Sequence, residues 1–172
     1  NMRYAHKLWV DANTGLLLKA AVMDRDKIVE QFAFTQLKIG GAIDKESLKP
    51  KYSAKTAEWH TTQSALSATE HGEIGWQVMD APAGFRKIME MKRNLSGKSV
   101  QVGHIALSDG LAAVSVFIEP IAKNTSPAAQ GLSPSQGAIN IYTRTVAGNL
   151  VTVVGEAPSA TVMQIGNSVV NK

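Results

Sequence analysis

The stretch that most constrains the fold runs from Val102 to Pro120, where two apolar runs flank the sequence Ser-Asp-Gly-Leu. Asp-Gly is typical of the two-residue loop of a β-hairpin, because a type I′ turn needs a positive φ at both central residues, which Asp tolerates and Gly adopts freely. With Asp109 and Gly110 as the whole loop, Leu107 faces Ala112 across the ribbon. The segment is therefore predicted to be an antiparallel hairpin.

The predicted hairpin has two unequal faces, since successive side chains of a strand point to opposite sides. Its apolar face carries Ile105, Leu107, Val114, Val116 and Ile118. Its other face carries Val102, His104, Ala106, Leu111, Ser115 and Phe117. A two-stranded ribbon is marginally stable alone in water, so this hairpin is expected to lie at the centre of a larger sheet.

The N-terminal part of the chain is interpreted as a three-stranded antiparallel meander. Its strands are predicted over residues 4–10, 16–23 and 28–39, with a turn ending at Gly15 and a polar reversal at 24–27. Ile28, Phe32 and Phe34 are expected to be buried. A sheet of this size has too little partner surface to cover its own apolar side.

Beyond residue 40 the composition changes twice. Residues 41–72 are rich in Lys, Ser and Thr and are interpreted as a linker, with a helical turn near 53–59. Strand patterns then return near Trp76 and over 85–95, 138–146 and 150–154. After Pro158, the residues Val162, Ile165 and Val169 recur at helical spacing.

Together these patterns predict a mostly β protein with minor α structure. The predicted parts are a meander at 1–40, a linker at 41–72 and a small domain at 73–172. In the small domain an antiparallel sheet of about five or six strands is covered by one C-terminal helix.

Composition excludes few function classes. The chain has no cysteine, which excludes disulfides and thiolate chemistry. The net charge of +4 suits solubility and leaves open a weak preference for anionic partners. No apolar run approaches the ~20 residues of a membrane-spanning helix. The N-terminal sequence NMRYAHKLWV is neither a signal peptide nor a natural start, so the chain is expected to be a fragment whose upstream half is missing.

The sequence contains no recognisable catalytic, cofactor-binding or metal-binding constellation, and the protein is not expected to be an enzyme. Its histidines are far apart in the sequence, at His6, His60, His71 and His104. No serine lies in a nucleophile elbow, and no glycine-rich phosphate loop is present. His104, placed near Ser115 by the hairpin, is expected to form a structural hydrogen bond.

A basic strand is the remaining candidate for a functional surface. Arg86, Lys87, Lys92 and Arg93 all lie within the strand predicted over 85–95. Charges on an edge strand usually prevent unwanted pairing, and the alternative is a surface for an anion or an acidic partner. Aromatic residues are not interleaved with these charges, so nucleic-acid binding is not expected.

The order and spacing of several motifs resemble the MucB/RseB family. The N-terminal motifs are LWVD at 8–11, TGLLLK at 14–19, DRD at 24–26 and EQF at 30–32. The C-terminal motifs are WQV at 76–78, PAGF at 82–85 and HIALSDGLAAVSVFIE at 104–119. The first set resembles the last strands of that family's large domain, a half-open barrel of the LolA/LolB kind, and the second resembles its small C-terminal domain.

The resemblance implies a periplasmic regulator of the envelope stress response. Such a protein binds the periplasmic domain of a RseA/MucA-type anti-sigma factor, shields it from proteolysis and keeps a sigma-E-type factor inactive. Lipopolysaccharide or another lipid would act through the upstream part of the large domain. No cofactor or metal is implied.

Within this interpretation a set of basic, aromatic and histidine side chains is expected to contact the partner. They are Arg86, Lys92, Arg93, His104, Phe117, Tyr142 and Arg144. The alternative function is a periplasmic lipid or lipoprotein carrier or sensor, and a hydrolase would need His, Asp or Glu clustered in one cleft. Without the expected upstream part of the barrel, the meander would expose apolar side chains and unpaired edges, so a homo-oligomer through residues 1–40 is also expected; these side chains are Leu16, Leu18, Phe32 and Phe34.

Overall fold

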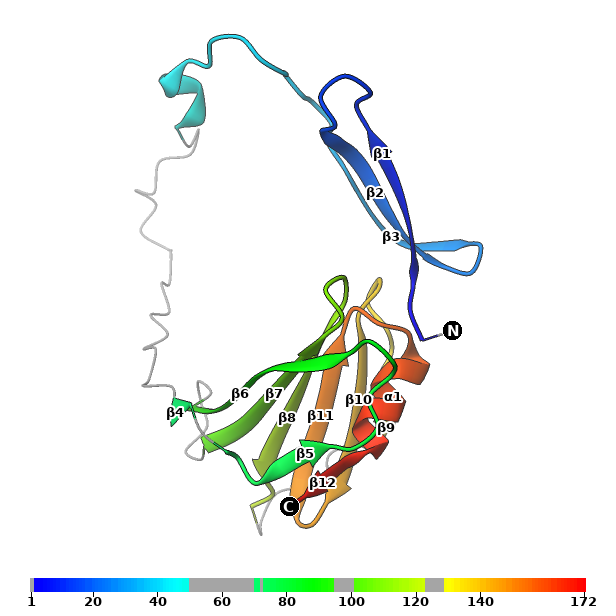
Figure 1. The fold of residues 1–172 in the computed structure, drawn as a ribbon, viewed down its shortest axis with the longest axis vertical. Helices are drawn as coiled ribbons and strands as arrows, with labels where there is room; N and C mark the ends of the chain where they lie inside the picture. The colour runs from blue at the N-terminus through cyan, green and yellow to red at the C-terminus, as the bar shows by residue number, and fades with distance from the viewer. Residues whose placement is uncertain (1, 50–69, 72, 95–100, 123–128) are drawn as a thin grey trace.

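The computed structural model describes residues 2–49, 70–71, 73–94, 101–122 and 129–172 and shows three antiparallel sheets. The first contains β1 (Ala5–Val10), β2 (Leu17–Asp24) and β3 (Lys27–Ala33), in chain order. The 3₁₀ helix η1 (Lys45–Leu48) follows it. This sheet stands apart from the main body in Figure 1 and makes contact with it near α1.

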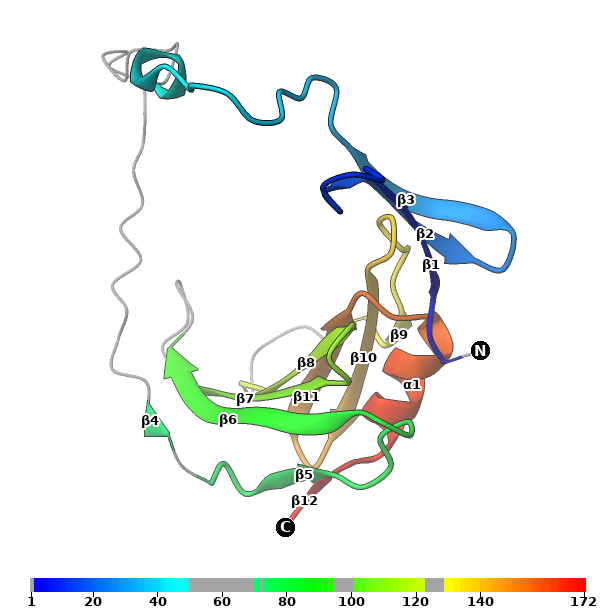
Figure 2. The same ribbon diagram turned by 45° about the horizontal axis from the view of Figure 1, so that its top comes forward.

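The main body is a seven-stranded sheet in the order β4-β6-β7-β8-β11-β10-β9. Its strands are β4 (Glu70–His71), β6 (Arg86–Asn94), β7 (Gln101–Ser108), β8 (Ala113–Pro120), β9 (Gly131–Leu132), β10 (Asn140–Val146) and β11 (Asn149–Gly155). The helix α1 (Ser159–Asn167) packs on β10 and β11, and β5 (Trp76–Val78) pairs with β12 (Val169–Asn171) on the same side (Figures 1 and 2). The prediction of a mostly β, antiparallel fold with one covering α-helix is confirmed for the described residues.

The core fills the space between the large sheet, α1 and the β5–β12 pair. Its central residues come from the predicted apolar face of the hairpin: Ile105, Leu107, Val114, Val116 and Ile118, each at most 3% exposed. The cluster is completed by Trp76, Phe85, Val151, Val153, Ala157, Val162, Ile165 and Val169. The hairpin of β7 and β8 is therefore central to the sheet, as its apolar pattern indicated.

The predicted register of this hairpin was wrong by two residues. Leu107 pairs with Val114 rather than with Ala112, and the loop spans Asp109–Ala112. Only Gly110 in this loop has a positive φ, +94°, so the turn is not type I′. The carboxylate of Asp109 accepts hydrogen bonds from the amides of Leu111 and Ala112, and this side-chain closure supports a wider turn. A shift of two residues keeps every side chain on its face, so the predicted core survived the error.

The two-residue turn with two positive φ angles lies in the next hairpin. Ala147 has φ 47° and Gly148 has φ 73°, and they join Val146 to its partner Asn149. The predicted hairpin around Gly148 is thus present, with its loop one residue earlier than expected. Ala147 lacks the freedom of glycine and adopts this conformation at some cost.

In the meander, the expectation of a buried apolar side was wrong. Ile28 is 46%, Phe32 54% and Phe34 48% exposed, because among the described residues no second layer packs over them. The third strand also ends at Ala33 rather than at Ile39. The turn at Gly15 was predicted correctly, with φ 72° at the glycine and the Asp11 carboxylate accepting from the Thr14 amide at 2.8 Å.

Other expectations were met in part. Val169, which extended the predicted helix, lies instead in β12 because α1 ends at Asn167. The helical turn expected near 53–59 lies outside the described residues, and the division at 1–40, 41–72 and 73–172 stays a prediction. No helix in the described parts of the chain has both the length and the apolar character needed to cross a membrane.

A polar joint attaches the meander to the main body. Arg3 forms an ion pair with Asp109 and donates to the Ala83 carbonyl at 2.5 Å. The joint is completed by three further contacts, namely Thr161 Oγ1 to the Met2 carbonyl at 2.5 Å, Asn140 Nδ2 to Tyr4 Oη at 2.8 Å, and the Ala138 amide to Glu30 Oε2 at 3.2 Å. The two sheets are therefore held together at several separate points.

Candidate functional site

The structure divides the seven predicted contact residues between the two faces of the large sheet. Strand alternation and the observed register place one group on the face that points away from α1: Arg86, Arg93, His104 and Phe117. The other group lies on the face that carries α1 and the core: Lys92, Tyr142 and Arg144. The seven residues therefore do not form one continuous patch.

His104 is the centre of a small cluster on the first of these faces. Its ring stacks on Phe117 with the centroids 4.4 Å apart, and its Nε2 lies 3.0 Å from Ser115 Oγ. Arg93 Nη1 lies 3.3 Å from the other ring nitrogen. Burial, together with the nearby Arg93 guanidinium, lowers the pKa of His104. The contact of His104 with Ser115 was predicted, although in the observed register Phe117 is the residue directly opposite.

Tyr142 and Arg144 hold the C-terminal end of α1 against the sheet. Tyr142 Oη donates to Asn167 Oδ1 at 2.8 Å, and Arg144 Nη1 donates to the Asn167 carbonyl at 2.9 Å. Carbonyl groups at a helix C-terminus lack intrahelical partners, and a cation there is favourable. These contacts give both side chains a role inside the fold.

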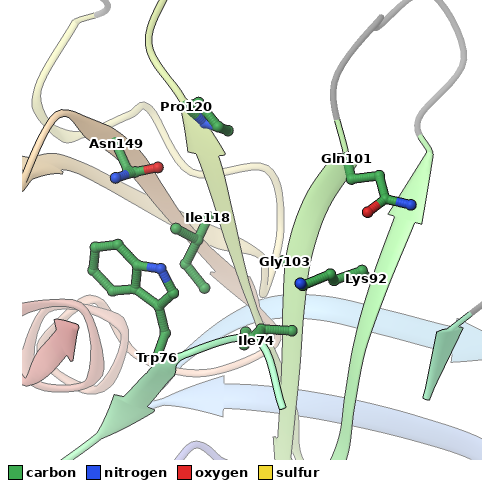
Figure 3. Close-up of a pocket in the computed structure, with 8 residues that line it drawn as sticks. All are labelled: Ile74, Trp76, Lys92, Gln101, Gly103, Ile118, Pro120 and Asn149. Atoms are coloured by element: carbon green, nitrogen blue, oxygen red, sulfur yellow. The ribbon is translucent and has the colours of Figure 1, made fainter. Parts of the chain in front are cut away.

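Lys92 is the one predicted residue that lines a described pocket. This pocket has a volume of about 230 Å³ and opens at the end of the large sheet near the start of β11. Its lining residues are Ile74, Trp76, Lys92, Gln101, Gly103, Ile118, Pro120 and Asn149 (Figure 3). We refer to it below as the β5 pocket, because Ile74 and Trp76 of the β5 segment form one of its walls.

The floor of the β5 pocket is apolar and belongs to the core. Trp76 is 6% and Ile118 3% exposed, and both belong to the main hydrophobic cluster. Gly103 opens the floor, since a Cβ at this position would lie 3.1 Å from Ile74 Cδ1. An isolated glycine within a strand often marks such a place, and this is the signal from which the pocket was detectable in the sequence.

The charge in the β5 pocket comes from Lys92, whose ammonium group points inward toward Gly103 in Figure 3. The acidic residue on the same face of β6, Glu90, has other partners: its carboxylate accepts from the Ile74 amide at 2.9 Å and pairs with Lys87. Burial raises the pKa of Glu90, but these hydrogen bonds hold it below its ordinary value. Glu70 of β4 is directly opposite Lys92 in the sheet, and among the other carboxylates of the described residues none forms an ion pair with Lys92.

The chemistry of the pocket is therefore recognition by apolar contact, amide hydrogen bonds and one cation. Within the described ranges, no three His, Cys, Asp or Glu side chains are grouped so as to hold a metal ion. The fold and this pocket together define a β-rich binding protein built from two sheet units.

Comparison with known proteins places this architecture in a family. Residues 1–52 match the model of the MucB/RseB N-terminal domain, and residues 70–170 match that of the MucB/RseB C-terminal domain. The chain belongs to the MucB/RseB family, which confirms the resemblance seen in its motifs.

Named relatives share this assignment. The sigma factor AlgU regulatory protein MucB of Pseudomonas aeruginosa is 30% identical over 169 residues, which is 97% of this chain and 52% of that protein. The sigma-E factor regulatory protein RseB of Haemophilus influenzae is 26% identical, over 96% of this chain and 50% of that protein. The chain thus spans about half the length of the curated relatives it matches.

Solved structures of MucB are also similar to this chain. MucB in complex with MucA(peri) matches with a TM-score of 0.73 at 28% identity, over 99% of this chain and 58% of that one. A crystal structure of MucB matches with a TM-score of 0.58 at 26% identity, over 99% of this chain and 54% of that one.

Proposed function

We propose that this protein is a regulatory binding protein that holds the periplasmic part of a MucA/RseA-type anti-sigma factor. The observation that carries the proposal is the match of nearly the whole chain to MucB in its complex with MucA. The polar joint supports it, because Arg3, Glu30 and their partners hold both sheets in one arrangement to which a second protein can bind.

The proposed mechanism is steric protection. A bound anti-sigma segment is accessible to a protease only while it is released, so tight binding lowers the rate of cleavage in proportion to the free fraction. Intact anti-sigma factor keeps the sigma-E-type factor inactive. A signal that favours a non-binding arrangement of the two sheets would restore cleavage. The proposed location is the periplasm, where the anti-sigma segment is exposed.

The test is binding of the full-length reading frame of this protein to the purified periplasmic domain of its anti-sigma factor, by calorimetry. A defined 1:1 complex is expected, and limited proteolysis of the anti-sigma domain should slow as the binding protein is titrated in. No heat of binding, with both proteins folded by circular dichroism, would contradict the proposal. If the two proteins bind but proteolysis of the anti-sigma domain does not slow, the proposed partner is correct and the proposed protection from proteolysis is wrong.

The second candidate is a lipid or lipoprotein carrier, and the exposed apolar side chains of the meander favour it. Leu8 is 58% and Phe32 54% exposed, and both lie beside Ala20 in the pairing of β1, β2 and β3. A carrier must enclose an acyl chain, so uptake of a fluorescent fatty acid by the full-length protein would support this function. Binding of the anti-sigma domain with no uptake of the acyl probe would exclude it.

A further inference from the structure

We propose that the β5 pocket takes one large apolar side chain of the partner polypeptide, with an acidic residue of the same segment bound to Lys92. The inference rests on the proposed function, because it names where the bound polypeptide is held. It is carried by the size, lining and charge of the pocket and assigns a contact site for the partner.

The size of the pocket favours an anchoring side chain over a separate small molecule. Its volume of about 230 Å³ is below the range of roughly 300–1,000 Å³ in which pockets enclose drug-sized ligands. Protein interfaces commonly bury a single aromatic or aliphatic anchor in a preformed pocket of this kind. A floor made of Trp76 and Ile118, which are already part of the core, is rigid and needs no rearrangement to receive it.

The rim of the pocket fits a peptide backbone beside that anchor. Gln101 and Asn149 present carboxamide groups there, and Asn149 uses only its Nδ2 internally, on the Ala147 carbonyl at 2.8 Å. Carboxamides both donate and accept, as a peptide group requires. The side chain and backbone of one extended residue would therefore find complementary groups in the pocket.

The charge specifies an acidic neighbour for the anchor. Lys92 is half-buried and points into the pocket, and apart from Glu70, which lies opposite it on β4, none of the described carboxylates is available to it, since Glu90 is occupied by Lys87 and the Ile74 amide. A carboxylate from the partner would give Lys92 a charge-assisted hydrogen bond in a partly water-excluded site. The pocket should therefore select segments in which Asp or Glu adjoins a Leu, Ile, Met, Phe or Trp.

The experiment uses the full-length protein and overlapping peptides that tile the periplasmic domain of its anti-sigma factor. The variants are Lys92→Glu, which leaves the core untouched, and Gly103→Val, which fills the floor. Lys27→Glu, an exposed residue of the meander, is the control with the same change in net charge. Lys92→Glu is expected to weaken the best peptide by about tenfold or more and Lys27→Glu by less than about twofold.

Two further readouts separate a binding role from a structural one. Replacing the acidic residue of the bound peptide with Lys should restore affinity to Lys92→Glu and weaken binding to the parent protein. In the 172-residue chain with Trp9→Phe and Trp59→Phe, Trp76 is the one remaining tryptophan, and its emission should shift on peptide binding because the anchor would contact its ring.

The outcomes distinguish this inference from the proposed function. Tight binding of the whole anti-sigma domain that is unchanged by Lys92→Glu and by folded Gly103→Val would overturn the pocket assignment and leave the proposed function standing. No binding of the whole domain to the parent protein would overturn both. Lys92→Glu could also lose affinity for the peptide without recovering it when the acidic residue of the peptide is replaced with Lys. That result would contradict the inference as well.

Discussion

At the scale of single residues, the carboxylate of Asp109 contacts both its own turn and the segment that leads into the meander. It accepts from the amides of Ala112 at 2.8 Å and Leu111 at 3.0 Å, and it pairs with Arg3 from the other sheet. The Ala112 hydrogen bond is the largest cause that lowers the pKa of Asp109 to about 2, and Arg3 adds to it against the opposing effect of burial. One side chain thus closes a turn and attaches the meander.

We expect Asp109→Asn to destabilise the folded protein by about 1–2 kcal/mol, because a hydrogen bond to a charged group is lost while the amide oxygen still accepts from the turn. The measurement is urea unfolding at neutral pH. Asp26→Asn, an exposed residue of the β2–β3 turn, is the matched control and should change stability little. Equal stability of Asp109→Asn and the parent would contradict this assignment.

The same carboxylate makes a pH-dependent contribution whose sign follows from its pKa. Since folding depresses that pKa from an ordinary 3.8 to about 2, the contribution is present above pH 4 and is lost as the pH falls toward 2. The stability difference between the parent and Asp109→Asn should therefore shrink over this interval. A difference that stays constant down to pH 2 would show that the charge of Asp109 is not involved.

Individual residues also show where sequence patterns fail. The apolar face of the hairpin was predictable because alternation survives a two-residue slip. The residues that contact the partner were less predictable, because the chemical type of a side chain does not reveal on which face of the sheet it lies. Arg86 and Lys92 share one strand but lie on opposite faces, since a bulge between Lys87 and Met89 changes the alternation.

At the scale of elements, α1 is held by close packing rather than by helix propensity. No side chain caps its N-terminus, and it contains Gly166 and β-branched residues. Gly166 is buried, and a Cβ there would lie 2.5 Å from Cδ1 of Tyr142. The glycine that weakens the helix in isolation is therefore what allows the helix to approach the sheet.

We expect Gly166→Ala to destabilise the protein by about 1–3 kcal/mol, because overpacking here outweighs the gain of about 1 kcal/mol in helix propensity. Tyr142 cannot move away freely, since its hydroxyl is bound to Asn167. Thermal unfolding provides the measurement. With Tyr142→Ala in the background, Gly166→Ala should instead be neutral or stabilising, and a penalty that persists there would exclude the clash as its cause.

The two hairpin turns show why loop geometry is harder to predict than strands. Asp-Gly indicated a type I′ turn at Asp109, but the Asp side chain bonds to amides further along and closes a longer loop. Ala147 carries no such signal, yet it adopts a positive φ because the strands on either side fix a two-residue connection. The first turn is thus decided by a local side-chain hydrogen-bond pattern that competes with the two-residue loop, and the second by the pairing of the strands on either side.

At the scale of the whole molecule, the joint between the sheets determines their relative orientation. Arg3 lies 5.0 Å above the Phe85 ring, as well as pairing with Asp109. Gly84 leaves room for the guanidinium, since a Cβ there would come within 2.9 Å of Arg3 Nη2. Arg3, which immediately precedes β1, thus contacts two turns of the main body, although its side chain remains 38% exposed.

We expect Arg3→Ala to loosen this arrangement, because it removes the ion pair and the contact with Phe85 together. The chain has no cysteine, so spin labels at Asp26→Cys and Glu156→Cys, both exposed, will report the distance between the sheets. The distribution should broaden in Arg3→Ala and stay narrow in the control Lys7→Ala, whose contact with Trp9 lies within the meander. Identical distributions would show that Arg3 does not fix the orientation.

The exposed face of the meander predicts self-association of this 172-residue chain. Leu8, Phe32 and Phe34 are each about half exposed or more, at 58%, 54% and 48%, and such adjoining apolar side chains favour pairing with a second copy. Light scattering should show the mean mass rising with concentration, and Phe32→Lys should reduce the effect. A monomer at all concentrations would contradict the prediction.

The overall organisation was more predictable than the contact between its parts. Period-two patterns and turn residues identified most strands of both sheets, because those signals are local. The joint has no such pattern: Arg3 meets Asp109 and Glu30 meets Ala138 across more than a hundred residues. The β5 pocket carries one local signal, the isolated Gly103 within a strand, but its lining comes from five separate segments, so the sequence did not predict the other lining residues.

The joint relies heavily on atoms that nearly every amino acid carries. The carbonyls of Met2 and Ala83 and the amide of Ala138 each receive or give one of its hydrogen bonds. Mutation at those three places leaves the bonding atom intact, proline at 138 excepted, so Met2 and Ala83 can change without loss of the contact, whereas the fully buried Ala138 has little room for a larger side chain. The contact between the meander and the main body can therefore persist while the sequence diverges. Coordinated changes would be needed only at Arg3, Tyr4, Glu30 and the side chains that they contact.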